Sequence, residues 1–215
     1  CAWYKCGHFF YFKKFKNFEP DIIVLSKALG GGKSSISATV SKSNIYNSVY
    51  GSIERANLHT TTYNGFGEEC ATAIEAINIL VEEKFDIKVK NLEKTVLKNL
   101  ENILSSNKDK IKKFQGTGAL WGVEFKSFIS GIENILEKIP SKYVEEKSFL
   151  IPKLVAASIS SELYLKYNIL TFISESKNSN FLYVAPSIIA KEEDINYFFE
   201  SLNKVINSGL NLNLV

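Results

Sequence analysis

The sequence of 215 residues is short of several features on which protein function often depends. Arg55 is the single arginine among 26 basic residues, so this chain has one source for a bidentate guanidinium contact to a carboxylate. Methionine is absent and the chain starts on Cys1, so we interpret it as part of a longer protein. No apolar run reaches the roughly 18 residues of a membrane span, and no signal segment is present. We expect a cytoplasmic protein with no membrane partner.

Paired cysteines and dense positive charge are also lacking. The three cysteines, Cys1, Cys6 and Cys70, have neither the even number nor the regular spacing of a disulfide framework. Cys1, Cys6 and His8 lie close together, but a zinc site usually brings a second close pair of ligands. None follows, so we expect no metal. The net charge is only +3, and residues 84–113 lack interleaved aromatics and arginine, so we expect no nucleic-acid partner.

What the chain does contain is the hydrophobic content of a globular protein, 45%, in which short apolar runs alternate with longer helical patterns. Residues 22–25 are fully apolar, as is typical of a buried parallel strand. Residues 35–40 alternate like a neighbouring strand, and three later segments are also strand-like: 119–125, 170–173 and 181–184. The pattern as a whole predicts an α/β fold.

Helical periodicity marks four segments. They are residues 68–83, residues 87–105, a stripe of Val155, Ile159, Leu163 and Tyr167, and a final helix that opens at Glu192 and carries Ile195, Phe198, Leu202 and Val205. A long polar insertion extends from residue 126 to about Ser148. The change from glycine-rich loops to lysine-rich helices near residue 84 predicts two domains, 1–83 and 84–215.

Residues 22–35, IIVLSKALGGGKSS, carry two lysines around a triple glycine. A phosphate-binding P-loop has a glycine five residues before its Gly-Lys-Ser ending. Here the ending Gly32-Lys33-Ser34 is present, but position 27 is Lys27, whose side chain blocks the backbone nest that holds the phosphate. The stretch is therefore not typical of a nucleotide-binding loop.

Lys27 instead has features of a reactive amine. It follows an apolar strand by one residue, so the strand holds its backbone, and partial burial there would favour the neutral, nucleophilic amine. The glycines at 30–32 permit a sharp turn and leave space for a flat ring. A surface lysine before a flexible turn fits the spacing as well, and the spacing alone leaves both interpretations open.

Four segments, in the same order along the chain, resemble the class III (ω-type) aminotransferases, which are pyridoxal-phosphate (PLP) enzymes of fold type I. Residues 19–32, EPDIIVLSKALGGG, are similar to the signature that carries the cofactor lysine. Residues 59–65, HTTTYNG, resemble the loop that binds the cofactor phosphate. Residues 116–125, GTGALWGVEF, and residues 5–10, KCGHFF, resemble two further family segments.

The resemblance implies a specific fold, cofactor and site. Residues 1–83 would be the C-terminal part of the PLP-binding large domain, and residues 84–215 the small C-terminal domain. Lys27 would be the catalytic residue, holding pyridoxal 5′-phosphate as a Schiff base. Thr61 and Thr62 would bind the phosphate in the active site of the neighbouring subunit, which implies a homodimer. His59 is interpreted as structural, and a β-rich turn without a binding role is the alternative for the threonines.

The implied activity is transfer of an amino group from an amine or ω-amino donor to an oxo acid or aldehyde. Another fold type I PLP enzyme, such as an aminomutase or a decarboxylase, is an alternative, and so is a catalytically inactive assembly domain.

The chain also departs from the family pattern. The aspartate that pairs with the pyridine nitrogen, the ring-stacking aromatic and the N-terminal half of the large domain are not in this sequence. We therefore expect the chain alone to be inactive, with the N-terminal half of the same enzyme as its partner. Tyr183 lies near a position where many members carry an arginine. The group that sets substrate specificity would then come from the N-terminal half, or the donor is a simple amine.

Overall fold

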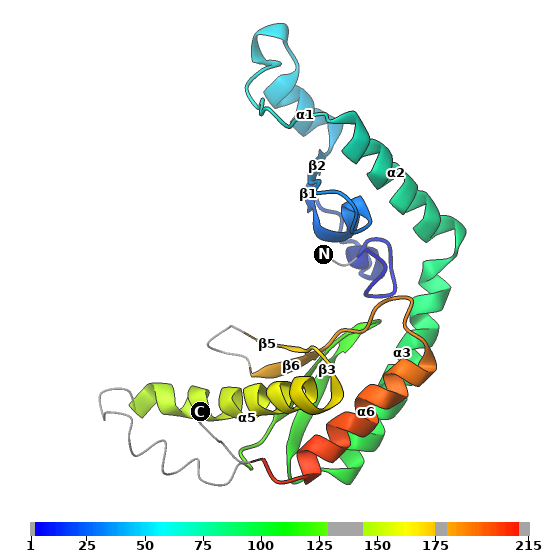
Figure 1. The fold of residues 1–215 in the computed structure, drawn as a ribbon. Coiled ribbons are helices and arrows are strands. Elements are labelled where there is room, and N and C mark those ends of the chain that lie inside the picture. Colours follow the sequence, from blue (N-terminus) through cyan, green and yellow to red (C-terminus); the bar gives the residue numbers. More distant parts are fainter. Residues whose placement is uncertain (1–2, 129–143, 175–179, 211–215) are drawn as a thin grey trace. The chain divides into compact units, whose positions relative to one another are not determined.

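The computed structural model describes residues 3–128, 144–174 and 180–210. Its contacts divide the chain into two compact units, Cys1–Ile87 and Lys88–Val215. The predicted boundary after residue 83 falls between helix α2 (Gly67–Glu82) and helix α3 (Phe85–Ser106), and the two units divide near the start of α3 (Figure 1). That these units correspond to a large and a small enzyme domain stays a prediction.

The first unit contains a two-stranded antiparallel sheet. Strand β1 (Ile22–Leu25) pairs with β2 (Ala38–Ser41), with Ile22 opposite Ser41 and Leu25 opposite Ala38. The strands are where the sequence predicts them, but the prediction of a buried parallel strand is wrong for this chain. Residues 26–37 connect the two strands through a short helical turn, whereas a parallel pair is usually joined by a crossover helix. Side chains of β1 alternate between exposed and half-buried because, among the described residues, only one face of the strand is packed.

A small core packs the strands against α2. Trp3, Leu29 and Ala73 are buried in one cluster, and half-buried side chains complete it: Phe9, Leu25, Ile36, Ala38, Ile77 and Leu80. The helix predicted for residues 68–83 is confirmed as α2, but its predicted stripe is not: Ala73 is buried, whereas Ile74 and Val81 are exposed. Four short helical elements have no predicted counterpart: η1 (Tyr11–Lys14), η2 (Lys27–Gly30), α1 (Ser43–Tyr50) and η3 (Ile53–Arg55). They are one or two turns long, too short for an apolar period to emerge.

The second unit is built on a four-stranded antiparallel sheet in the order β3-β4-β6-β5. Its strands are β3 (Ile111–Thr117), β4 (Leu120–Phe125), β5 (Phe172–Ile173) and β6 (Phe181–Val184). Helix α5 (Val144–Tyr167) packs on β4, β5 and β6, and α6 (Glu192–Asn207) packs on α5 (Figure 1). The predicted stripe of α5 is confirmed, since Val155, Ile159 and Leu163 are fully buried. Strand β3 was not predicted because most of its side chains are exposed or half-buried.

The last helix differs slightly from its predicted stripe. Ile195, Leu202 and Val205 are buried as predicted, whereas Phe199 is buried and Phe198 only half-buried. The polar insertion predicted up to Ser148 ends earlier, because α5 already begins at Val144, and residues 129–143 lie outside the described residues. Among the helices described, none is both long enough and apolar enough to cross a bilayer.

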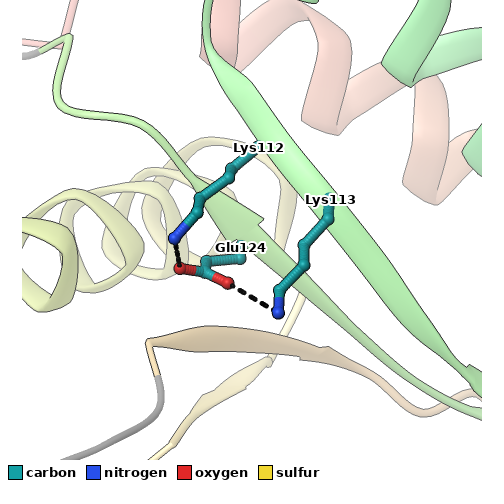
Figure 2. A network of polar contacts seen from close by, with 3 residues as sticks. All are labelled: Lys112, Lys113 and Glu124. Carbon is teal, nitrogen blue, oxygen red and sulfur yellow. Dashed lines mark hydrogen bonds and ion pairs between the residues drawn. The ribbon is translucent and has the colours of Figure 1, made fainter.

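A bulge in β3 places two lysines beside one carboxylate. Ile111 pairs with Phe125 and Lys113 with Glu124, so Lys112 is an extra residue in the strand. Figure 2 shows the result: Lys112 Nζ lies 2.7 Å from Glu124 Oε1, and Lys113 Nζ lies 3.5 Å from Oε2. The lysine side chains are more than half exposed, but that of Glu124 is only 11% exposed. The two cations therefore compensate a carboxylate that has little access to water.

We predict that replacing Lys112 and Lys113 together with alanine destabilises the β3–β4 hairpin by about 2 kcal/mol, since the buried Glu124 carboxylate loses both cations. Native-state hydrogen exchange of the β4 amides should become roughly 30-fold faster. Lys98→Ala, at an exposed lysine of α3, is the control and should change little. Adding Glu124→Gln to the double variant should restore part of the protection, and no restoration would contradict the electrostatic explanation.

Candidate functional site

Lys27 is the first residue of η2, one residue after β1 ends. Its φ of 59° lies in the left-handed region that side-chain-bearing residues rarely adopt. Such a conformation costs on the order of 1–3 kcal/mol and persists only where surrounding contacts impose it. Other described non-glycine residues with positive φ are Tyr4, Asn17, Lys84 and Asn168, so strain alone does not single out Lys27.

The contacts that hold this turn come from elements distant in sequence. The indole Nε1 of Trp3 donates a hydrogen bond to the Ser26 carbonyl at 3.1 Å, directly before Lys27. Leu29 is buried in a cluster with Trp3 and Ala73 of α2. The backbone of η2 is thus held from both sides of Lys27. Sequence reasoning missed Trp3 and Ala73; the helical period of α2 was the available signal for Ala73.

The glycine run closes the turn tightly on one side and leaves it open on the other. A Cβ at Gly30 would lie 2.8 Å from Ser34 Oγ, and one at Gly31 would lie 3.0 Å from the Ala76 Cβ of α2. A Cβ at Gly32 would meet nothing within 4 Å. Glycine is therefore needed where the turn packs, and open space lies beside Gly32. After Ser34 the chain leads to β2 and not into a helix, unlike a P-loop.

Lys27 itself is exposed, so the predicted partial burial is wrong for this chain. The sequence pattern indicated a covered strand end, but β1 pairs only with β2 among the described residues and no second layer covers its end. In the part of the chain that the structure describes, the Lys27 amine makes no hydrogen bond or ion pair. The residue therefore presents an unpartnered amine on a rigidly held turn.

The two predicted phosphate-binding residues lie in a turn between η3 and α2. Asn64 N donates to the Thr61 carbonyl at 3.1 Å, and Gly65 has a φ of 73°. The segment is a turn and not a strand, which agrees with the turn of the alternative interpretation but not with its strand content. Thr61 and Thr62 are exposed, and their hydroxyls have no hydrogen-bond partner within the described chain.

Neighbouring polar groups of this segment are already engaged. Thr60 Oγ1 donates to the Asn57 carbonyl at 3.3 Å, and the Tyr50 hydroxyl lies 3.4 Å from His59 Nδ1. His59 therefore contacts α1, in line with a structural role. No hydrogen bond joins Thr61 or Thr62 to Lys27 among the residues described, so the chain by itself does not link its predicted site residues.

The single arginine is used within the first unit. Arg55 Nη1 donates to the Ser48 carbonyl at 2.6 Å, and Arg55 Nε donates to Ser52 Oγ at 3.3 Å. The guanidinium therefore binds the end of α1. In the second unit, Tyr183 of β6 lies opposite Gly122 and Phe172 and lines a cavity of about 620 Å³.

Comparison with known proteins agrees with the resemblance found in the sequence. The family model "Aminotransferase class-III" matches residues 4–206. An aminotransferase structure from Bacillus anthracis superposes with a TM-score of 0.74 at 20% identity, over 97% of this chain and 43% of its own. An ornithine aminotransferase from Plasmodium yoelii gives 0.70 at 21% identity, over 95% of this chain and 45% of its own.

A third structure is adenosylmethionine-8-amino-7-oxononanoate aminotransferase from Methanocaldococcus jannaschii. Its TM-score is 0.71 at 22% identity, and the match covers 96% of this chain and 44% of the other. The chain thus spans less than half the length of these proteins, and its fold corresponds to part of a fold type I aminotransferase. Because the family model covers nearly the whole chain, this protein belongs to the class III aminotransferases, a family of PLP-dependent enzymes.

Proposed function

We propose that the enzyme containing this chain is a PLP-dependent aminotransferase. It would move an amino group from an amine or ω-amino donor to an oxo acid or aldehyde acceptor. The observation that carries this proposal is the unpartnered amine of Lys27, which stands on a turn held by Trp3 and by α2 in a chain that the family model matches over residues 4–206.

The described residues suit the chemical groups of the cofactor. An exposed amine is the partner that an aldehyde requires, and Lys27 offers one. The exposed hydroxyls of Thr61 and Thr62 are donors suited to a phosphate dianion. The open space beside Gly32 gives room for a ring close to the lysine turn. We therefore propose Lys27, Thr61 and Thr62 as cofactor-binding residues, with Lys27 also catalytic.

When bound, PLP supplies an aldehyde that condenses with amines and a ring that withdraws electrons from the donor carbon. Lys27 would hold the cofactor through its aldehyde carbon. The released Lys27 amine would then move a proton between the donor carbon and the aldehyde carbon, which is general acid–base work. Thr61 and Thr62 would orient the cofactor through its phosphate.

We also infer that segments outside this chain complete the active site. Among the described residues, no carboxylate is identified as the partner of the pyridine nitrogen, and no aromatic side chain as the one that stacks on the cofactor ring. The chain also spans under half the length of its structural relatives. The chain alone is therefore proposed to be inactive, and the working enzyme to be a homodimer. Cysteines without disulfide spacing suit a reducing compartment, so we propose a cytoplasmic location.

The shortage of arginine leaves two arrangements: the group that sets specificity comes from the N-terminal half, or the donor lacks an α-carboxylate. Arg55 is occupied at the end of α1, and Tyr183 lies near the position where the family often has arginine. This chain therefore has no free guanidinium for an α-carboxylate. A donor without that group, such as a simple amine or an ω-amino compound, agrees with this arrangement.

Transfer of ¹⁵N in the full-length enzyme tests the proposal. With PLP, a ¹⁵N-labelled ω-amine donor and an oxo acid acceptor, we expect the label to appear in the amino acid formed, as measured by mass spectrometry. An α-amino dicarboxylate offered as donor should react more slowly. Label that moves only within the donor molecule would indicate an aminomutase, release of CO₂ would indicate a decarboxylase, and no turnover of any donor would favour an assembly domain.

A further inference from the structure

A cavity of about 620 Å³ lies in the second unit. Three segments line it: the turn after α5 at residues 168–171, the chain from the end of β6 through residue 190, and the first two turns of α6. All three belong to the same compact unit. Cavities of roughly 300–1,000 Å³ are the size that proteins use for small ligands.

The cavity leaves large apolar side chains in contact with water. Leu170 is 70% exposed, Ile189 is 73% exposed and Tyr197 is 51% exposed, and all three line the cavity. Ile195 and Phe199 of α6, which also line the cavity, are themselves buried and form its inner wall. Apolar groups gathered around one hollow are a feature of binding sites and not of ordinary surface.

Most polar groups around the cavity are already satisfied. The Tyr197 hydroxyl donates to the Tyr167 carbonyl at 3.1 Å, and Thr171 Oγ1 donates to Ser160 Oγ at 2.8 Å. In contrast, the Tyr183 hydroxyl has no hydrogen-bond partner within the described residues. A ligand in the cavity would therefore make mainly apolar contacts and could form a hydrogen bond with the Tyr183 hydroxyl.

The charge of the lining limits the ligand further. Asp194 is the only charged residue among the described residues that line the cavity, and its Oδ2 accepts a hydrogen bond from Lys191 N at 3.0 Å. The Lys191 ammonium is paired with Glu193 at 3.3 Å. An anionic ligand would lose water without gaining a cation, whereas a neutral or amine-bearing ligand would meet no such cost.

We propose that this cavity binds a small molecule with an aromatic or aliphatic body and no negative charge, anchored between Leu170, Ile189 and Tyr197. This site lies within the second unit and does not rest on the aminotransferase proposal. Its occupant can therefore be sought whether or not the enzyme transfers amino groups.

Two fluorescent probes with the same ring skeleton test the proposal on the full-length protein. N-phenyl-1-naphthylamine is neutral, and 1-anilinonaphthalene-8-sulfonate adds one sulfonate. We expect the neutral probe to bind saturably at one site per chain and at least tenfold more tightly than the sulfonate. Equal affinities, or enhancement that does not saturate, would overturn the proposal.

Matched variants locate the site. Ile189→Glu should weaken binding of the neutral probe at least tenfold, because it places a charge at the apolar wall. Ile53→Glu is the control, since Ile53 is 91% exposed in the other unit, and it should leave binding unchanged. Leu170→Glu provides a second variant if Ile189→Glu alters the circular dichroism spectrum. Unchanged binding in a folded variant at either cavity position would refute the location.

Discussion

Replacing Lys27 with alanine in the full-length enzyme is expected to abolish covalent attachment of PLP and to lower kcat by roughly 10³-fold or more. This decrease in kcat is expected because the variant loses both the amine that anchors the cofactor and the group that moves the proton. Borohydride reduction followed by peptide mass mapping measures the attachment directly. In the unmodified enzyme the label should lie on the peptide that contains Lys27.

Lys33 provides the matched control for this result. It is also an exposed lysine beside the same glycines, but it follows the turn and does not begin it. Lys33→Ala should keep the reducible cofactor and most of the activity. Label on Lys33 in place of Lys27 would show that the assignment of the reactive amine is wrong, even if the enzyme is an aminotransferase.

The second large effect concerns sharing of the active site between subunits. Lys27→Ala and Thr62→Ala chains should each be nearly inactive alone, but a mixture should recover about one quarter of the activity. In a symmetric dimer, random mixing makes half of the dimers mixed, and each of these contains one intact site and one doubly altered site. The exposed, unpartnered hydroxyls of Thr61 and Thr62, not joined to Lys27 in the described chain, favour this arrangement.

Two tags and a neighbouring threonine make the experiment decisive. Mixed dimers can be isolated by attaching a different affinity tag to each chain, so that recovery is measured on dimers known to be mixed. Thr60→Ala is the control, because the Thr60 hydroxyl already donates to the Asn57 carbonyl, and this change should leave cofactor binding intact. Isolated mixed dimers without activity would mean that Thr62 serves the site of its own subunit.

Local sequence was sufficient for the four longest helices described and for the family. The segments α2, α3, α5 and α6 were predicted because apolar residues repeat every three or four positions along one helix, although in α2 the stripe so predicted is largely exposed. The family assignment rested on short continuous segments around Lys27 and Thr61, and the match over residues 4–206 confirms it. Helical periodicity and family motifs both depend on residues close together in the chain, so they can be recognised without knowing which other segment they contact.

Strand pairing could not be obtained in the same way. A short apolar run such as Ile22–Leu25 predicts a strand, but its partner, its direction and its cover depend on residues elsewhere. The structure pairs it with β2 in antiparallel fashion and leaves Lys27 exposed. Strand β3 escaped prediction because its bulge puts Lys112 and Lys113 beside the same carboxylate, which breaks the alternation expected of a strand.

By itself, then, the sequence determined the family, the reactive lysine as a hypothesis and the helical framework, because each depends on residues close together in the chain. Only the tertiary structure decided that Trp3 and α2 hold the lysine turn, that Glu124 lies between two lysines, and that Leu170, Ile189 and Tyr197 surround one cavity. These arrangements join segments far apart in sequence, and packing and burial, not local propensity, bring such segments together.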